Sequence, residues 1–115
     1  MKYMLLITQD PASAPSAPSE WEAMHAAYGA FTRSIVDSGE LVAGDALEGN
    51  DTATCVRVRD GRATTTDGPF AETKEHIGGF YVVDVKDLDR ALELAAQIPG
   101  AATGTIEVRP VRDVG

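Results

Sequence analysis

The sequence is poor in cysteine, in basic residues and in long apolar runs, and each shortage excludes a class of protein. One cysteine, Cys55, is present among 115 residues, so no internal disulfide can form and a reducing cytoplasm is the expected compartment. Lysine and arginine number 10 against 18 aspartates and glutamates. The resulting net charge of −8 argues against direct binding to nucleic acid or to an anionic membrane surface.

Apolar stretches are also short. No run approaches the ~20 residues of a membrane-spanning helix. Residues 3–7 form the first apolar run, which is too short for a signal peptide and is followed by no cleavage site. With 43% hydrophobic and 24% charged residues, the chain has the composition of a single soluble globular domain covering residues 1–115.

Several motifs of known chemistry are missing as well. Gly78-Gly79 lacks the context of a phosphate-binding glycine loop, and no serine lies in a nucleophile-elbow pattern. His76 has helical spacing to Glu72 or Glu75, but no third ligand is visible for a metal ion. We therefore predict neither a metal nor another cofactor.

Apolar periodicity predicts alternating strands and helices. The expected strands cover residues 3–8, 41–47, 54–59, 62–66, 80–85 and 105–109. Ser19 is expected to cap the first helix, which should end at Ser38-Gly39. Its apolar stripe comprises Trp21, Met24, Tyr28, Phe31 and Ile35. Asp87 is expected to cap a second helix with an apolar face of Leu88, Ala91, Leu92, Ala95 and Ile98.

The connections have their own signals. Residues 11–18 contain three prolines with alanine and serine, which predicts an exposed loop of polyproline II character. Asp60-Gly61 predicts a tight hairpin turn between two strands. The strand before this turn alternates Val56 and Val58 with polar residues, which is typical of a half-buried strand, and Cys55 is expected to be a small buried side chain.

Residues 67–80 form the most unusual stretch of the chain. Asp67-Gly68-Pro69 is turn chemistry, because glycine supplies positive φ and proline fixes φ, so the ring of Phe70 is placed by a stiff turn. Paired glycines at 78 and 79 then predict a bulge or a close backbone approach at the start of a strand.

This stretch resembles the signature of the DGPF-domain proteins of the YCII-related (YciI-like) family. The matching residues are Asp67-Gly68-Pro69-Phe70, Ala71-Glu72-Thr73-Lys74-Glu75 and Gly78-Gly79-Phe80, extended by residues 1–7, 27–31 and 104–111. The resemblance implies an α+β, ferredoxin-like fold of the dimeric α+β barrel group. That fold has an antiparallel sheet with two helices on one face.

Two helices can cover only one face of a sheet, so the other face needs a different cover. Self-association as a symmetric homodimer is the simplest solution. This argument from the residues agrees with the resemblance.

The candidate site residues each have a structural and a functional interpretation. His25 is either a flanking histidine or a general base. The resemblance implies a catalytic dyad of a first-helix histidine and an aspartate. Alignment at the helix end places that histidine on Tyr28, so the dyad is not reproduced. Asp67 is a turn residue or a rim carboxylate, and Phe70 is a core plug or a cavity wall.

The charged residues after Phe70 complete the candidates. Glu72 and Lys74 form a solvated charge run or contact a ligand. Arg57 and Arg59 are expected to be solvated, unless one faces a dimer cavity, where it would bind a carboxylate.

Two functions stay open. The first is an enzyme or binding protein for a small molecule, held in a cleft between the first helix and the 67–80 stretch; relatives on this fold carry out cofactor-free chemistry. The second is a non-catalytic partner of a sigma factor in transcription initiation, because the DGPF proteins resemble a group encoded beside such factors. An enclosed cavity with convergent polar groups around Tyr28 and Phe70 favours the first function, and a filled core there favours the second.

Overall fold

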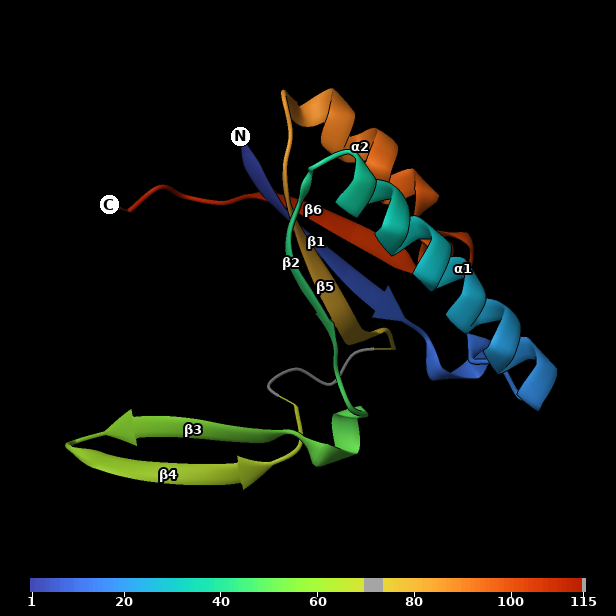
Figure 1. The fold of residues 1–115 in the computed structure, drawn as a ribbon. Helices are drawn as coiled ribbons and strands as arrows, with labels where there is room; N and C mark the ends of the chain where they lie inside the picture. Colours follow the sequence, from blue (N-terminus) through green and yellow to red (C-terminus); the bar gives the residue numbers. More distant parts are fainter. Residues whose placement is uncertain (70–73, 115) are drawn as a thin grey trace.

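Four antiparallel strands form the main sheet of the computed structural model, which describes residues 1–69 and 74–114. They lie in the order β2-β5-β1-β6 (Figure 1). Their bounds are Lys2–Gln9 for β1, Leu41–Ala46 for β2, His76–Asp84 for β5 and Thr105–Pro110 for β6. Helices α1 (Pro18–Asp37) and α2 (Leu88–Gln97) cover one face of this sheet (Figure 1). The α+β, ferredoxin-like arrangement with two helices on one face is confirmed.

The core lies between the helices and the sheet. Along β1 the buried side chains alternate, and Tyr3, Leu5 and Ile7 are 3%, 0% and 7% exposed. Val83 of β5 and Leu94 of α2 meet them from a neighbouring strand and from the helix layer. Alternation along a strand therefore places one apolar row in the core and leaves the next row on the opposite face.

That opposite face has no helix over it. The intervening side chains of β1 and β5 are Met4, Leu6, Phe80 and Val82, all half-buried. Leu6 lies opposite Phe80 and Met4 lies opposite Val82 in the strand register. We call these four residues the open face. Its centre is apolar, and no described segment of the chain forms a layer over it (Figure 1).

The other two strands form a separate hairpin. Strand β3 (Thr54–Arg59) pairs only with β4 (Arg62–Asp67) among the described residues. Asp60 and Gly61 have φ of 52° and 75°, which confirms the predicted tight turn. We call this hairpin, residues 54–67, the arm. It projects from one end of the sheet, away from the helices (Figure 1).

The arm corrects two predictions about its strands. Val56 and Val58 are 64% and 60% exposed, so β3 is not a half-buried strand. Cys55 is half-buried rather than buried, and its thiol donates to the carbonyl of Gly68 at 3.2 Å. The alternation correctly predicts a strand with two unlike faces, but no helix or second sheet among the described residues packs against either face (Figure 1).

The start of α1 also differs from its prediction. The helix begins at Pro18 with Ala17 as its N-cap, so Ser19 is already inside the helix and does not cap it. Proline is favoured at the first helical position, where its missing N–H has no partner to lose. Glu20 accepts the backbone N–H of Ser16 at 3.0 Å, which ties the preceding chain to the first turn.

Helix α2 begins where the sequence predicts. The carboxylate of Asp87 accepts the backbone N–H of Arg90 at 2.9 Å, which confirms the expected N-cap. Its predicted apolar face needs a correction, because Leu88 and Leu92 are each 46% exposed while Leu94 is 1% exposed. No described helix is both long enough and apolar enough to span a bilayer.

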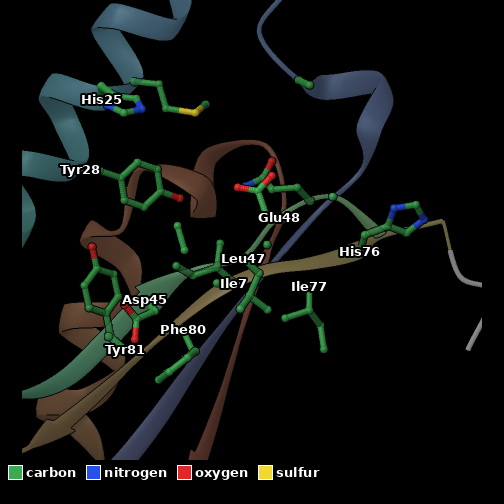
Figure 2. Close-up of a pocket in the computed structure, with 18 of the residues that line it drawn as sticks. Ile7, His25, Tyr28, Asp45, Leu47, Glu48, His76, Ile77, Phe80 and Tyr81 are labelled. Atoms are coloured by element: carbon green, nitrogen blue, oxygen red, sulfur yellow. The ribbon is translucent and has the colours of Figure 1, made fainter. Parts of the chain in front are cut away.

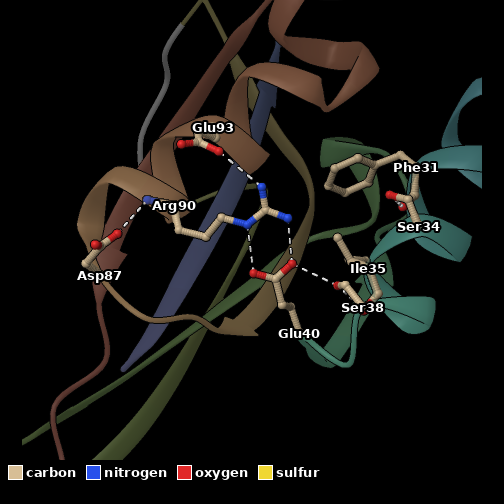
Figure 3. Close-up of polar contacts among 8 residues, drawn as sticks. All are labelled: Phe31, Ser34, Ile35, Ser38, Glu40, Asp87, Arg90 and Glu93. Atoms are coloured by element: carbon tan, nitrogen blue, oxygen red, sulfur yellow. Dashed lines mark hydrogen bonds and ion pairs between the residues drawn. The ribbon is translucent and has the colours of Figure 1, made fainter.

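A charged contact joins the two helices across the end of the sheet. Glu40, which follows α1, accepts from Arg90 of α2 at 2.9 Å to Nε and 2.8 Å to Nη2 (Figure 3). Ser38 donates to the same carboxylate at 2.8 Å, and Glu93 accepts from Arg90 Nη1 at 3.1 Å. The guanidinium lowers the pKa of the Glu40 carboxyl to about 2. Paired donors in this geometry bind a carboxylate firmly.

Candidate functional site

A cleft of about 660 Å³ opens between α1 and the sheet (Figure 2). Its walls are mainly apolar and aromatic, with side chains from α1, the end of β1, β2 and β5. The residues used below are Trp21, Met24, His25, Tyr28, Tyr81 and Ile7. This size and lining are typical of small-molecule sites.

The helix stripe forms both the core and the cleft wall. Phe31 and Ile35, at the C-terminal end of α1, are 6% and 1% exposed. Tyr28 and Met24, one and two turns earlier, are half-buried, and Trp21 is 48% exposed. One regular stripe therefore packs on the sheet at one end and borders the cleft at the other.

Tyr28 reaches towards the short helical turn after α2, η3 (Pro99–Ala102). Its hydroxyl forms a hydrogen bond with the backbone of Gly100, and burial raises the pKa of the phenol. A Cβ at position 100 would lie 2.7 Å from that hydroxyl, so glycine is needed there for the approach. The raised pKa keeps the phenol protonated at neutral pH, so Tyr28 can donate a hydrogen bond but is no base.

Tyr81 is the second fixed phenol of the cleft. Its hydroxyl shares a hydrogen bond of 2.7 Å with Thr32 Oγ1. Its ring packs edge-on against Phe31, with centroids 5.2 Å apart and planes at 68°. Tyr81 of β5 and Tyr28 of α1 lie on the same side of the sheet, while Phe80 and Ile77 point to the other side (Figure 2). Alternation along the predicted strand could have identified Tyr81 as a wall residue.

The charged side chains of the cleft are mostly acidic. Asp10, Asp45 and Glu48 line it, and among the described lining residues there is no lysine or arginine. Asp10 accepts the N–H of Ala12 at 2.9 Å and pairs with Lys74 at 3.5 Å. The Ala12 hydrogen bond, with a smaller contribution from Lys74, lowers the pKa of Asp10. The cleft therefore favours an uncharged or cationic ligand.

The predicted site residues fall in different places. His25 and Tyr28 line the cleft, and Lys74 contacts it indirectly by pairing with Asp10. Asp67 ends β4 and is not among the residues that line the cleft. Phe70 and Glu72 lie outside the described residues.

Two parts of the site were missed from the sequence. Residues 11–18 are not simply an exposed polyproline loop, because η1 (Pro11–Ser13) forms a helical turn after the Asp10 cap. Pro11 and Pro15 line the cleft. Sequence spacing predicts for Glu75 a place in a solvated charge run, a pairing with Lys74 or a weak metal ligand, but its carboxylate accepts from Thr8 at 3.0 Å and Thr105 at 3.3 Å. These contacts attach Glu75, in the 67–80 stretch, to strands β1 and β6 beside the cleft.

The paired glycines have the role that the sequence predicts. The register between β1 and β5 shifts at Ile7 and Thr8, where Gly78 is the extra residue. A Cβ at Gly79 would lie 2.9 Å from the carbonyl of Asp45, so β2 approaches the backbone closely. Both the bulge and the close approach are confirmed, and they shape the mouth of the cleft.

The described residues bring no three His, Cys, Asp or Glu side chains together in a group able to hold a metal ion. His25 and His76 lie at separate positions around the cleft (Figure 2). The ionisable side chains that line the cleft are phenols, imidazoles and carboxylates.

Comparison with known proteins identifies a family, a relative and a solved structure that resemble this chain. The YCII-related domain matches residues 1–114. An uncharacterized protein of Rhizobium meliloti (strain 1021) is 40% identical over 84 residues, covering 71% of this chain and 68% of that protein. The solved 5-chloro-2-hydroxyhydroquinone dehydrochlorinase of Burkholderia phenoliruptrix, in complex with 2,5-dihydroxybenzoquinone, has a similar fold, with a TM-score of 0.57. It is 13% identical, and the match covers 97% of this chain and 94% of that one.

Proposed function

The chain belongs to the YCII-related family, and from this membership we propose that it is a homodimer that binds a small aromatic molecule in the α1 cleft. The observation that carries the proposal is the cleft itself, about 660 Å³ with aromatic walls and a few polar groups. A filled interior near Tyr28 would have supported the alternative, a regulatory partner of a sigma factor.

The polar groups suggest how the ligand is held. The Tyr28 phenol, kept protonated by its raised pKa, donates a hydrogen bond to an oxygen or nitrogen of the ligand. His25, on the neighbouring turn of α1, is exposed and lines the same cleft, so its imidazole can donate or accept a hydrogen bond. A phenol donor beside an imidazole is suited to proton transfer on a phenolic ring.

A protein of similar fold supports the proposal that the ligand is a ring compound. The dehydrochlorinase structure is a complex with 2,5-dihydroxybenzoquinone, a small ring compound. At 13% identity its residues do not transfer to this chain, but its structure shows that a protein of this fold can bind such a ring.

The homodimer rests on the open face. Met4, Leu6, Phe80 and Val82 form a contiguous apolar centre on two paired strands. Arg109 lies opposite Met4 and Glu107 opposite Leu6, so opposite charges border this centre on β6. A self-complementary surface of this kind suits a twofold symmetric dimer.

Three matched phenols test the binding proposal: p-cresol is neutral, tyramine is cationic and 4-hydroxyphenylacetate is anionic. Trp21 is the only tryptophan and lines the cleft, so its fluorescence reports binding. We expect p-cresol and tyramine to quench it and 4-hydroxyphenylacetate to bind most weakly. Tyr28→Phe should weaken p-cresol binding about 5- to 10-fold, the value of one hydrogen bond.

The control is Tyr3→Phe, which removes a phenol that is 3% exposed in the core and does not line the cleft. Its affinity for p-cresol should equal that of the wild type. The proposal fails if no phenol alters Trp21 fluorescence, or if Tyr28→Phe binds p-cresol as the wild type does.

A further inference from the structure

The arm is an unusual feature for an isolated chain. A two-stranded hairpin alone is at best marginally stable in water. Its two strands are paired with each other and, among the described residues, with no third strand. With six residues in each strand, the arm extends about 20 Å beyond the turn η2 (Asn50–Thr52).

The two faces of the arm differ. Val56 lies opposite Thr65 and Val58 lies opposite Ala63, so one face is apolar and carries valines that are 64% and 60% exposed. The other face carries Arg57 and the facing pair Arg59 and Arg62. An amphipathic hairpin of this kind is suited to an apolar surface with acidic surroundings.

The charge of the arm is opposite to that of the remaining chain. Residues 54–67 contain three arginines and two aspartates, a net charge of +1, so the rest of the chain carries −9. The arm also projects on the side of the sheet away from the helices, which is the side of the open face (Figure 1). The charge of the arm and the direction in which it projects therefore both indicate the same partner, a second copy of this chain.

We infer that the arm is a dimerisation arm, which crosses to the second protomer and packs its Val56 and Val58 face against it. This inference rests on the homodimer of the proposed function. The two open faces meet at the centre of the dimer, and each arm reaches the rest of the partner chain, which is acidic. A Val56→Thr, Val58→Thr double variant keeps the β-branched shape of both side chains and removes their apolar contacts.

Sedimentation velocity over a protein concentration series measures the dimer dissociation constant. Four valines lose their contacts in each dimer, so we expect the dissociation constant to rise by about 100-fold. The matched control is Leu88→Thr, Leu92→Thr, which changes two exposed aliphatic residues on α2, each 46% exposed, in the helix layer. That control should dimerise as the wild type does.

Trypsin supplies a second readout, because the arm carries Arg57, Arg59 and Arg62. Cleavage in the arm should slow as the wild-type concentration rises through the dissociation constant, and should stay fast in the valine variant. The inference is overturned if the valine variant dimerises normally, or if trypsin cuts dimer and monomer equally fast.

Leu6→Asp separates this inference from the homodimer itself. It places a charge at the centre of the open face, so it should leave a monomer whether or not the arm contributes. If Leu6→Asp stays dimeric, the open-face dimer is wrong. If it is monomeric while the valine variant keeps wild-type affinity, the open-face dimer stands and the arm inference is wrong.

Discussion

The main sheet with its two helices, which we call the body, and the arm use the same alternation of apolar and polar residues. They differ in whether another layer of the structure covers one face of the strands. In β1 every second side chain is buried under helices, with Leu5 at 0% exposure. In β3 the corresponding valines are at least 60% exposed, because no helix of the described residues lies over the hairpin (Figure 1). Period-two alternation therefore predicts a strand with two unlike faces, but the burial of one face depends on the layer that covers it.

The largest expected difference between the two regions is in core packing. Leu5→Ala should lower the free energy of unfolding by about 3–4 kcal/mol, because it leaves a cavity under both helices. Val58→Ala, at a concentration where the protein is monomeric, should change it by less than about 0.5 kcal/mol. Urea denaturation followed by circular dichroism measures both. Equal losses would mean that the arm belongs to the same cooperative unit as the core.

A smaller effect is expected at the charged contact between the helices. Glu40→Gln removes one charge from the pair with Arg90 and should cost about 1 kcal/mol at neutral pH. The pKa of Glu40 is lowered to about 2 in the folded protein, from its ordinary value of 4.5. The stabilisation is therefore fully present above pH ~4.5 and is lost as pH falls towards 2.

Denaturation of wild type and Glu40→Gln along a pH series checks this dependence. The two stability curves should converge in acid and stay parallel above pH ~5. A difference that persists at pH 2 would show that the substitution acts through packing rather than through the charge.

The smallest expected effect is at the tip of the arm. Gly61 has φ of 75°, so Gly61→Ala strains the turn of the hairpin. We expect faster amide hydrogen exchange along β3 and β4, with almost no change in the unfolding of the monomeric body. Residue-resolved exchange measured by NMR distinguishes local opening from global unfolding. Faster exchange in the main sheet or the helices, or a large fall in the global free energy of unfolding, would contradict the separation of the arm from the rest of the chain.

These comparisons explain which features the sequence could predict. Local chemistry identified the Asp87 cap, the Asp60-Gly61 turn and the Gly78-Gly79 bulge, because each depends on residues close together in the chain. The helix order and the uncovered face followed from periodicity and from the resemblance. Ser19 failed as a cap because Pro18 competes for the same turn and is suited to its first position.

The site was harder to predict, because it joins segments that are far apart in the chain. Tyr28 was identified from the helix stripe and the resemblance. Its contact with Gly100 brings together residues 72 positions apart, and no local pattern encodes it. Most of the proline segment is exposed, as its composition predicts, but composition did not predict the helical turn η1 or that Pro11 and Pro15 line the cleft.

The free edges of the arm have a consequence for the fate of newly made chains. Within the described structure each strand of the hairpin pairs on one side only, so the outer edges present backbone donors and acceptors to any passing strand. Arg57, Arg59 and Arg62 place like charges on one face of this template, and charged residues of this kind suppress runaway strand addition. The arginines therefore make the exposed edges of a newly made chain a poor template for the addition of a strand from another chain.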